Sequence, residues 1–178
     1  MEKVKLKKFI EQNGLTPVAL LNTHLHFDHI YGNKFILETF GLKTYASPKD
    51  QFFIDTFIDQ LNIFQMPADE QAPEIGTKIK EGDVIEIGSI KLQVIETPGH
   101  SAGSVCFYAK EQNVCFTGDT IFKQSVGRTD FPTGSQREIM ESITGKLLRL
   151  PDDTILYPGH GESTDVAWEK LNNPYLEY

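Results

Sequence analysis

The sequence is poor in cysteine, tryptophan and arginine, and it has no long apolar run. Its two cysteines, Cys106 and Cys115, cannot build a disulfide framework and are expected to pack in strands. No stretch approaches the ~18 consecutive apolar residues of a membrane-spanning helix. The opening segment MEKVKLKKFI has no apolar stretch behind its charges, so it does not resemble a secretory signal. These absences predict a soluble cytoplasmic protein with no membrane partner.

Positive charge is also scarce. Lysine and arginine number 17 against 25 acidic residues, so the formal net charge is −8. A net-acidic chain with few arginines is poorly suited to a phosphate backbone, and we expect no nucleic-acid partner. The length of 178 residues and the 39% hydrophobic content predict one compact domain over residues 1–178 with a substantial core.

Hydrophobic periodicity predicts helices and a short strand in the first half of the chain. Leu6, Phe9 and Ile10 recur at helical spacing. Ser47-Pro48 is a helix-start signal, and an i, i+4, i+8 apolar stripe behind it indicates a buried helix face. The expected elements are an opening helix ended at Gly14, a strand at 18–21, a helix through 35–40 closed by Gly41, and a core helix carrying Phe53, Phe57 and Leu61.

The second half is rich in strands that turn signals divide into hairpins. Gly88-Ser89 separates two strand-like runs, and residues 110–113 separate two more. Ser135 and Glu138 form a capping-box pattern. The expected elements are strands at 84–87, 90–96, 104–109, 114–117 and 154–157 and a helix carrying Ile139, Ile143 and Leu147. This mixture predicts an α/β sandwich instead of a regular doubly wound sheet.

All five histidines stand at the end of a predicted strand or in the loop after it. Three belong to the pattern His-x-His-x-Asp-His, in which an extended backbone lets the first two point the same way. The other two each follow a Pro-Gly pair, and an aspartate follows Thr-Gly at a further strand end. A lone histidine near a turn is usually an ordinary residue, but imidazoles and carboxylates gathered in this way are ligands for Zn²⁺, Fe²⁺ or Mn²⁺. The candidate ligands are His24, His26, Asp28, His29, His100, Asp119 and His160.

These motifs resemble those of the metallo-β-lactamase superfamily, and within it the glyoxalase II-like hydrolases. The resemblance covers Thr23 to Tyr175 and implies a four-layered αββα sandwich. The element at 127–132 and the stop soon after His160 resemble short forms without a C-terminal helical domain. The motifs are the histidine pattern, Thr97-Pro98-Gly99-His100-Ser101, Thr117-Gly118-Asp119-Thr120, Gly127-Arg128-Thr129-Asp130-Phe131-Pro132 and Pro158-Gly159-His160-Gly161.

The resemblance also implies a site for two divalent transition-metal ions, with zinc expected first and iron or manganese as alternatives. Asp28 and Asp119 would be catalytic, because they would hold the ions and orient the nucleophile. Arg128 falls where the family places a cationic contact for glutathione, and a local ion pair with an aspartate, Asp130 or Asp119, explains it equally well. One ion would bind His24, His26 and His100, the other Asp28, His29 and His160, and Asp119 would bridge both.

Two metal ions ~3.5–4 Å apart can share a water and lower its pKa towards neutrality. The resulting metal-bound hydroxide would attack the carbonyl of an S-acylglutathione-type thioester, S-lactoylglutathione being the family's typical substrate. We therefore expect a hydroxyacylglutathione hydrolase-like thioesterase that acts on a small molecule.

Other activities fit the same residues. Persulfide dioxygenases of this superfamily carry a similar Gly-Arg-Thr-Asp-Phe element and would place one iron on His24, His100 and Asp119. A lactonase or another hydrolase of this fold is a further alternative. A catalytically impaired, metal-binding assembly subunit is the non-enzymatic alternative.

The chain differs from the family pattern ahead of the histidines. Family members carry several strands there, whereas only 23 residues precede His24, so the first N-terminal strands are expected to be missing. An open sheet face would expose Val18, Leu20 and Leu21. We therefore expect self-association, most simply as a homodimer that covers this edge.

Overall fold

The computed structural model describes residues 2–68 and 71–176. The chain divides into two compact units, Met1–Lys78 and Ile79–Tyr178. Each unit has its own sheet and its own hydrophobic cluster.

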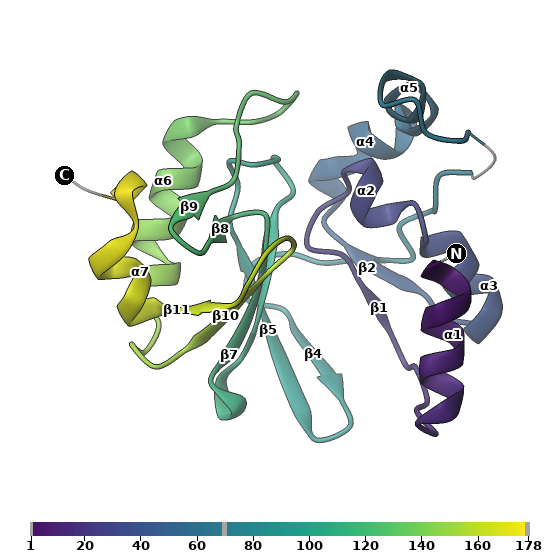
Figure 1. Cartoon of the computed structure of the whole chain (residues 1–178), viewed down its shortest axis with the longest axis horizontal. Helices are drawn as coiled ribbons and strands as arrows, with labels where there is room; N and C mark the ends of the chain where they lie inside the picture. The colour runs from purple at the N-terminus through teal and green to yellow at the C-terminus, as the bar shows by residue number, and fades with distance from the viewer. Residues whose placement is uncertain (1, 69–70, 177–178) are drawn as a thin grey trace. The chain divides into compact units, whose positions relative to one another are not determined.

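The described residues of the first unit form helices and a three-stranded sheet (Figure 1). The strands are all parallel in the order β1-β2-β3, with Leu20 opposite Thr44 and Tyr45 opposite Thr77. The elements are α1 (Glu2–Gln12), β1 (Leu20–Leu21), α2 (Phe27–Ile30), α3 (Asn33–Phe40), β2 (Thr44–Ala46), η1 (Pro48–Asp50), α4 (Gln51–Asp55), α5 (Phe57–Ile63) and β3 (Thr77–Lys78).

The helices of this unit begin and end near the predicted signals. α3 ends at Gly41, whose φ of 65° is a left-handed conformation that glycine adopts without strain. Ser47 caps η1, because its side-chain oxygen accepts a hydrogen bond from the Lys49 N–H at 3.3 Å. The strand expected at 18–21 is shorter than predicted, since only Leu20 and Leu21 pair with β2.

The predicted apolar stripe lies in the core of the first unit. Phe53, Phe57 and Leu61 are at most 2% exposed, as their spacing predicts. They do not share one continuous helix, because Thr56 interrupts it between α4 and α5. Leu25 and Ile30 belong to the same cluster, so the core packs directly against the segment that carries three of the histidines.

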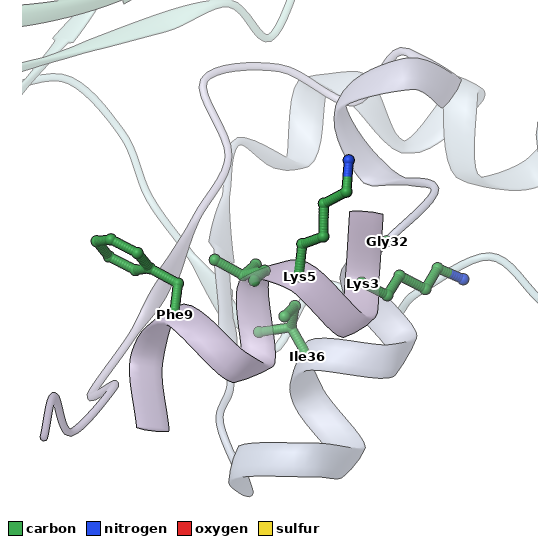
Figure 2. A pocket seen from close by; sticks show the side chains of 6 residues that line it. Lys3, Lys5, Phe9, Gly32 and Ile36 are labelled. Atoms are coloured by element: carbon green, nitrogen blue, oxygen red, sulfur yellow. The ribbon is translucent and has the colours of Figure 1, made fainter. Parts of the chain in front are cut away.

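Helix α1 leaves apolar side chains in solvent. Val4 is 56% exposed, Leu6 45% and Phe9 57%. Val18 is 59% exposed, as expected, whereas Leu20 and Leu21, which the sequence also predicts to be exposed, are half-buried. A hollow of about 430 Å³ beside α1 and α3 is lined by Lys3, Lys5, Leu6, Phe9, Gly32 and Ile36 (Figure 2).

The described residues of the second unit form a six-stranded sheet in the order β11-β10-β7-β6-β5-β4 and a small hairpin of β8 and β9. The hairpins predicted at 84–96 and 104–117 are confirmed. The elements are β4 (Val84–Ile87), β5 (Ile90–Glu96), β6 (Val105–Ala109), η2 (Lys110–Gln112), β7 (Val114–Gly118), β8 (Ile121–Phe122), β9 (Ser125–Val126), α6 (Gln136–Gly145), η3 (Leu147–Arg149), β10 (Ile155–Pro158), β11 (Thr164–Asp165), α7 (Val166–Asn172) and η4 (Pro174–Leu176).

Strand direction brings three chain segments to one edge of this sheet. β7 and β10 are parallel, and β6 is antiparallel to both β5 and β7. Strands β5, β7 and β10 therefore run the same way, and their carboxyl ends lie at the same edge. The loops after these three strands carry His100, Asp119 and His160.

Helices α6 and α7 cover one face of the six-stranded sheet (Figure 1). Ile139, Ile143 and Leu147 are fully buried in the hydrophobic cluster of this unit, as predicted, but Leu147 lies in η3 because α6 ends at Gly145. The predicted capping box is half formed. Ser135 accepts a hydrogen bond from the Glu138 N–H at 3.3 Å, but its own N–H donates to the Gly99 carbonyl at 2.8 Å.

The described helices are short, and none of them is both long enough and apolar enough to cross a bilayer. The expected cytoplasmic location stays a prediction. The expected single domain over residues 1–178 also stays a prediction beside the division into two units.

Candidate metal centre

The first cluster of candidate ligands, His24, His26, Asp28 and His29, lies in one segment of the first unit. It follows β1 and continues into α2. His26 is the N-cap residue of α2, with an extended conformation of φ −62° and ψ 150°. His29 lies inside this short helix, which corrects the expectation that all five histidines stand at strand ends or in the loops after them.

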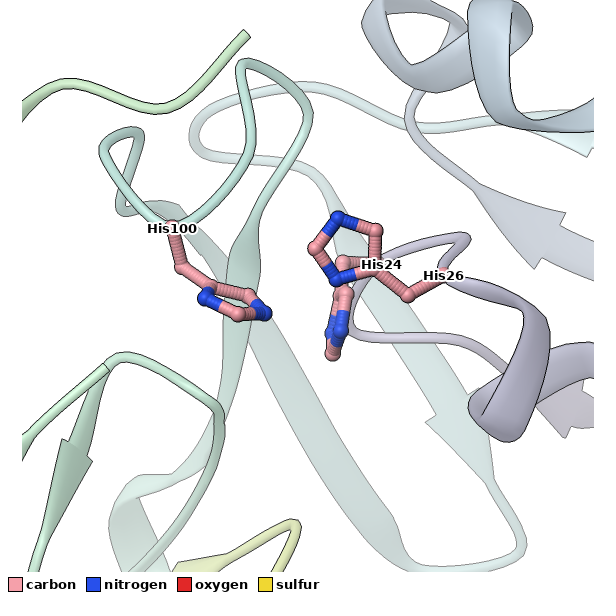
Figure 3. A group of neighbouring side chains, drawn as sticks. All are labelled: His24, His26 and His100. Carbon is pink, nitrogen blue, oxygen red and sulfur yellow. The ribbon is translucent and has the colours of Figure 1, made fainter. Parts of the chain in front are cut away.

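The side chains of the first cluster gather together. The ring centroids of His24 and His26 are 4.8 Å apart with an interplanar angle of 88° (Figure 3), and those of His24 and His29 are 4.0 Å apart. His29 Nε2 lies 3.6 Å from Asp28 Oδ2. The expectation that the first two histidines point the same way is therefore consistent with the structure of this segment.

Two buried polar residues hold this segment, and sequence reasoning missed both. Asp50, which is 0% exposed, accepts a hydrogen bond from the Leu25 N–H at 3.0 Å, between two of the histidines. Asn22 donates from its side chain to the His29 carbonyl at 3.2 Å. Asp50 stands in the Ser47-Pro48 capping motif, and no local pattern distinguishes it from an ordinary first-turn acid.

The second cluster, His100, Asp119 and His160, lies at the sheet edge of the second unit. Asp119 Oδ2 is 3.7 Å from His100 Nε2 and 3.6 Å from His160 Nε2. The side chains of His100 and Asp119 are 4% and 11% exposed, whereas that of His160 is 58% exposed. One carboxylate oxygen therefore lies near two imidazole nitrogens that come from different loops.

The orientation of His100 is set by a backbone carbonyl. His100 Nδ1 lies 2.7 Å from the Arg128 oxygen. A carbonyl oxygen only accepts hydrogen bonds, so Nδ1 carries the proton and the lone pair of the neutral ring is on Nε2, the nitrogen near Asp119. His100 itself is labelled in Figure 3, on the loop that follows β5.

Two glycines allow the loops of the second cluster to pack closely. A Cβ on Gly99, where φ is 136°, would lie 2.2 Å from the Ile139 nitrogen of α6. A Cβ on Gly127 would lie 1.8 Å from the Asp119 carbonyl oxygen. Ser142 of α6 completes the support, since its hydroxyl donates to the Pro98 carbonyl at 2.8 Å. The backbone that carries His100 and Asp119 is thus confined on several sides.

The donor atoms of both clusters fit divalent metal ions. The three N···O separations of 3.6–3.7 Å exceed the 2.7–3.2 Å of a hydrogen bond. Two ligand atoms that each lie ~2.1 Å from a tetrahedral ion are ~3.4 Å apart. Imidazole nitrogens and carboxylate oxygens are also the donors that zinc, iron and manganese accept. Each cluster therefore has the donor types and spacing of a metal-ligand set, while the division of the seven ligands between two ions stays a prediction.

Arg128 has a local partner. Its Nε and Nη2 donate to the two carboxylate oxygens of Asp130, each at 2.6 Å, and its guanidinium lies 4.0 Å from the Phe131 ring centroid. Hydrogen bonding to Arg128 lowers the pKa of Asp130 to about 2. The expected ion pair with Asp130 is present, and the expected contact to glutathione stays a prediction.

The two cysteines pack inside the sheet, as expected. Cys106 and Cys115 are both 0% exposed and are free thiols. A hydrogen bond to Cys106, together with burial, raises the pKa of the Cys115 thiol well above its usual range. Cys115 therefore remains a neutral thiol near pH 7.

Comparison with known proteins points to one family. The sequence profile of the metallo-β-lactamase superfamily matches residues 2–160. Hydroxyacylglutathione hydrolase GloC of Haemophilus influenzae is 35% identical over 177 residues, which are 98% of this chain and 83% of that protein. The candidate ligands therefore lie within the matched residues.

Solved structures also match the fold of this chain. The BLEG-1 B3 metallo-β-lactamase matches with a TM-score of 0.91 and 34% identity over 98% of this chain and 84% of its own. A protein crystallised in a di-iron-bound form matches with a TM-score of 0.87 and 33% identity over 97% and 84%. ETHE1 from Myxococcus xanthus matches with a TM-score of 0.78 and 28% identity over 97% and 69%. The predicted α/β fold class is confirmed.

Proposed function

Since the chain belongs to the metallo-β-lactamase superfamily and is a metallo-hydrolase of that group, we propose that it hydrolyses an S-acylglutathione-type thioester. The similarity to a hydroxyacylglutathione hydrolase over 98% of the chain supports this substrate class. The observation that carries the proposal is the second cluster, in which two imidazole nitrogens lie 3.6 and 3.7 Å from the same Asp119 oxygen.

We assign the seven candidate ligands to two divalent ions. Zinc is the first choice, and iron or manganese is the alternative, because a similar protein was crystallised with two irons. When bound, the pair of ions supplies a water of lowered pKa and polarises a carbonyl. One ion is assigned to His24, His26 and His100, the other to Asp28, His29 and His160, and Asp119 is assigned to both.

The side chains around the ions have separate roles in this proposal. Asp28 and Asp119 would hold the ions through their carboxylate oxygens and would help to orient the water. His100 donates a hydrogen bond from Nδ1 to the Arg128 carbonyl, which leaves Nε2 as the nitrogen that faces the ion. All five histidines are assigned as ligands, so the reaction needs no Ser–His–Asp triad. The leaving group is a thiolate, which departs without strong general-acid assistance.

Arg128 is the proposed contact for the glutathione moiety. Its side chain is 57% exposed, and its guanidinium carbon lies 4.0 Å from the centroid of the Phe131 ring. The guanidinium has five N–H donors, and its hydrogen bonds to Asp130 use the nitrogens Nε and Nη2. A substrate carboxylate could therefore bind the same group by charge-assisted hydrogen bonds.

Thioester hydrolysis by metal-loaded protein tests the proposal. We expect S-lactoylglutathione to be hydrolysed faster than by the free metal ion, and no turnover above free metal would contradict the function. Arg128→Ala should raise KM for glutathione thioesters more than for an uncharged thioester. Arg137→Ala, which removes an exposed arginine paired with Glu141, is the matched control. Equal losses on both substrates would show that Arg128 is structural only.

A mononuclear-iron dioxygenase acting on glutathione persulfide is the second candidate. The Gly-Arg-Thr-Asp-Phe element at 127–131, which is similar to that of persulfide dioxygenases in this superfamily, favours keeping it. Elemental analysis discriminates the two activities. One iron per chain with oxygen consumption on glutathione persulfide supports the dioxygenase, and two ions with thioester turnover support the hydrolase. A lactonase would turn over lactones instead, and a metal-binding assembly subunit would bind ions without any turnover.

A further inference from the structure

A buried group of hydroxyls and one thiol lies at the bases of the loops that carry the second cluster. Its members, which we call the hydroxyl network, are Thr97, Cys106, Thr117 and Thr120. All four are at most 1% exposed. Thr97 stands three residues before His100, and Thr120 is the residue after Asp119. The network therefore joins the bases of two loops that carry candidate metal ligands.

One hydrogen bond links the two ligand loops side chain to side chain. Thr97 Oγ1 lies 3.0 Å from Thr120 Oγ1, although the two residues are 23 positions apart in sequence. Thr97 Oγ1 also lies 3.3 Å from Cys106 Sγ, and Cys106 Sγ lies 3.6 Å from the Thr117 carbonyl oxygen. All these atoms lie in the interior, where each polar group needs a partner.

One consistent assignment of donors and acceptors accounts for the hydrogen bonds of the network. The Thr117 carbonyl can only accept, so Cys106 donates to it. Thr97 then donates to Cys106 Sγ, and Thr120 donates to Thr97 Oγ1. This assignment uses each proton once and leaves the Thr97 hydroxyl as both donor and acceptor. Removing that hydroxyl breaks the link at its centre.

The network reaches the third loop as well. The Thr117 hydroxyl lies 3.3 Å from the Ile121 carbonyl and 3.4 Å from the Tyr157 carbonyl of β10. Tyr157 stands three residues before His160, and the Gly159 N–H donates to the Gly118 carbonyl at 2.9 Å. The bases of the loops for His100, Asp119 and His160 are thus tied to one another behind the ligands.

We infer that Thr97 and Thr120 are positioning residues for the metal centre, an inference that rests on the proposed function. Their hydroxyl–hydroxyl bond keeps His100 and Asp119 at the spacing that one ion needs. Neither threonine is a ligand, and neither contacts substrate. Removing a group that orients a metal ligand typically changes metal affinity ~10–100-fold.

Metal affinity, measured by competition between the full chain and a chromophoric chelator for Zn²⁺ and for Co²⁺, tests this inference. Thr97→Val and Thr120→Val should each weaken binding of at least one ion by ~10–100-fold. Thr97→Ser, which keeps the hydroxyl, should bind within a few-fold of wild type. The Co²⁺ absorption spectrum should shift in the two valine variants and not in the serine variant.

Thr154→Val is the matched control. Thr154 is also 0% exposed, and its hydroxyl donates to Asn113 Oδ1 at 2.8 Å. It directly precedes β10, whereas His160 follows the other end of that strand. Thr154→Val loses one buried hydrogen bond, like the test variants, so its melting temperature should fall while its metal affinity stays at the wild-type value. The double variant Thr97→Val/Thr120→Val should weaken binding about as much as one single variant, because both changes remove the same bond.

The outcomes are distinct. Wild-type affinity in both valine variants, or an equal loss of affinity in Thr154→Val, would overturn the positioning role while leaving the proposed function in place. Failure of the wild-type chain to bind either ion would overturn both proposals. If Thr97→Val does not fold, Thr120→Val tests the same bond from its other partner.

Discussion

Asp119 is the residue on which most of the site depends. Its Oδ2 atom lies within 3.7 Å of imidazole nitrogens from two loops, and its backbone oxygen is in close contact with Gly127. A divalent cation bound among these side chains would contact the carboxylate oxygen and both imidazole nitrogens at once.

Replacing a single histidine ligand should therefore lower the number of metal ions bound per chain. His24→Ala and His160→Ala should each lose about one ion per chain, because each removes one ligand from a different proposed ion. Asp55→Ala is the control, since Asp55 is an exposed carboxylate that accepts a hydrogen bond from Gln51. Elemental analysis of the purified proteins measures the change. The same stoichiometry in all three variants would show that the ligand assignment is wrong.

The ion pair between Arg128 and Asp130 should remain formed at acidic pH. Hydrogen bonding to Arg128 lowers the pKa of Asp130 to about 2. Because the pKa of Asp130 is lower in the folded state, its ionised form stabilises the fold at pH values above the unfolded pKa of ~3.9. This contribution is lost as the pH falls through the pKa of the folded state. Because both side chains are exposed, the effect on stability should be small.

Carboxyl NMR should report an Asp130 titration midpoint near 2 in the wild-type chain. Arg128→Ala should raise this midpoint towards ~3.9, because the charged form loses its donor. Arg137→Ala, which breaks a different exposed ion pair, should leave it unchanged. A midpoint near the unfolded value in wild type would show that the pair does not form in solution.

At the scale of the element, the carboxyl edge of the six-stranded sheet builds the second cluster. Strands β5, β7 and β10 run the same way, and the loops after them are held by α6 and by the segment at 127–128. The segment contributes its backbone, through the Arg128 carbonyl on His100 and through Gly127 against Asp119. This role explains why a small residue stands at position 127.

Gly127→Ala should therefore damage both the fold and the metal centre. Its Cβ would lie 1.8 Å from the Asp119 carbonyl oxygen, and the backbone must move to relieve that clash. Overpacking of this kind costs ~1–3 kcal/mol or more. Thermal unfolding and metal titration should both show the loss.

Gly145→Ala is the matched control for this prediction. A Cβ at Gly145 of α6 meets nothing within 4 Å, so the change should be neutral or should stabilise by ~0.4–1 kcal/mol. Wild-type stability and metal affinity in Gly127→Ala would contradict the close packing of the two loops.

At the scale of the whole molecule, exposed apolar surface is the feature to explain. The first unit leaves Leu6, Phe9 and Val18 between 45% and 59% exposed. Fully burying one such side chain stabilises by ~1.5–3 kcal/mol, against a net stability of ~5–15 kcal/mol for an ordinary domain. We therefore expect self-association through exposed apolar residues of the first unit, as a homodimer with two-fold symmetry.

Sedimentation velocity at micromolar concentration measures the association. The wild-type chain should sediment as a dimer, and Phe9→Lys should shift it towards monomer, because a charge at the contact disfavours burial. Lys91→Ala, on an exposed hairpin of the second unit, is the surface control. A stable wild-type monomer with a sharp unfolding transition would contradict the proposed dimer.

Local patterns in the sequence were sufficient to predict many of the elements and to name the candidate ligands, whereas β2, β3, β8, β9, β11 and α7 were not predicted. Turn signals such as Gly41 and Ser47 act on their immediate neighbours, and core stripes depend only on spacing, so both predict structure without a three-dimensional partner. Even so, the strand expected at 18–21 shortened to Leu20–Leu21, because a strand extends only as far as its neighbour pairs with it.

The tertiary structure alone decided how the candidate ligands are held. Asp50 bonds to Leu25, the Arg128 carbonyl bonds to His100, and Thr97 bonds to Thr120, across 25, 28 and 23 positions in sequence. None of these residues stands in a pattern that names its partner, because a hydrogen bond between distant segments depends on where the fold brings them. The sequence by itself determined which side chains can bind metal, since that follows from imidazole and carboxylate chemistry. Only the folded chain determined which other groups hold them in place, since that follows from packing.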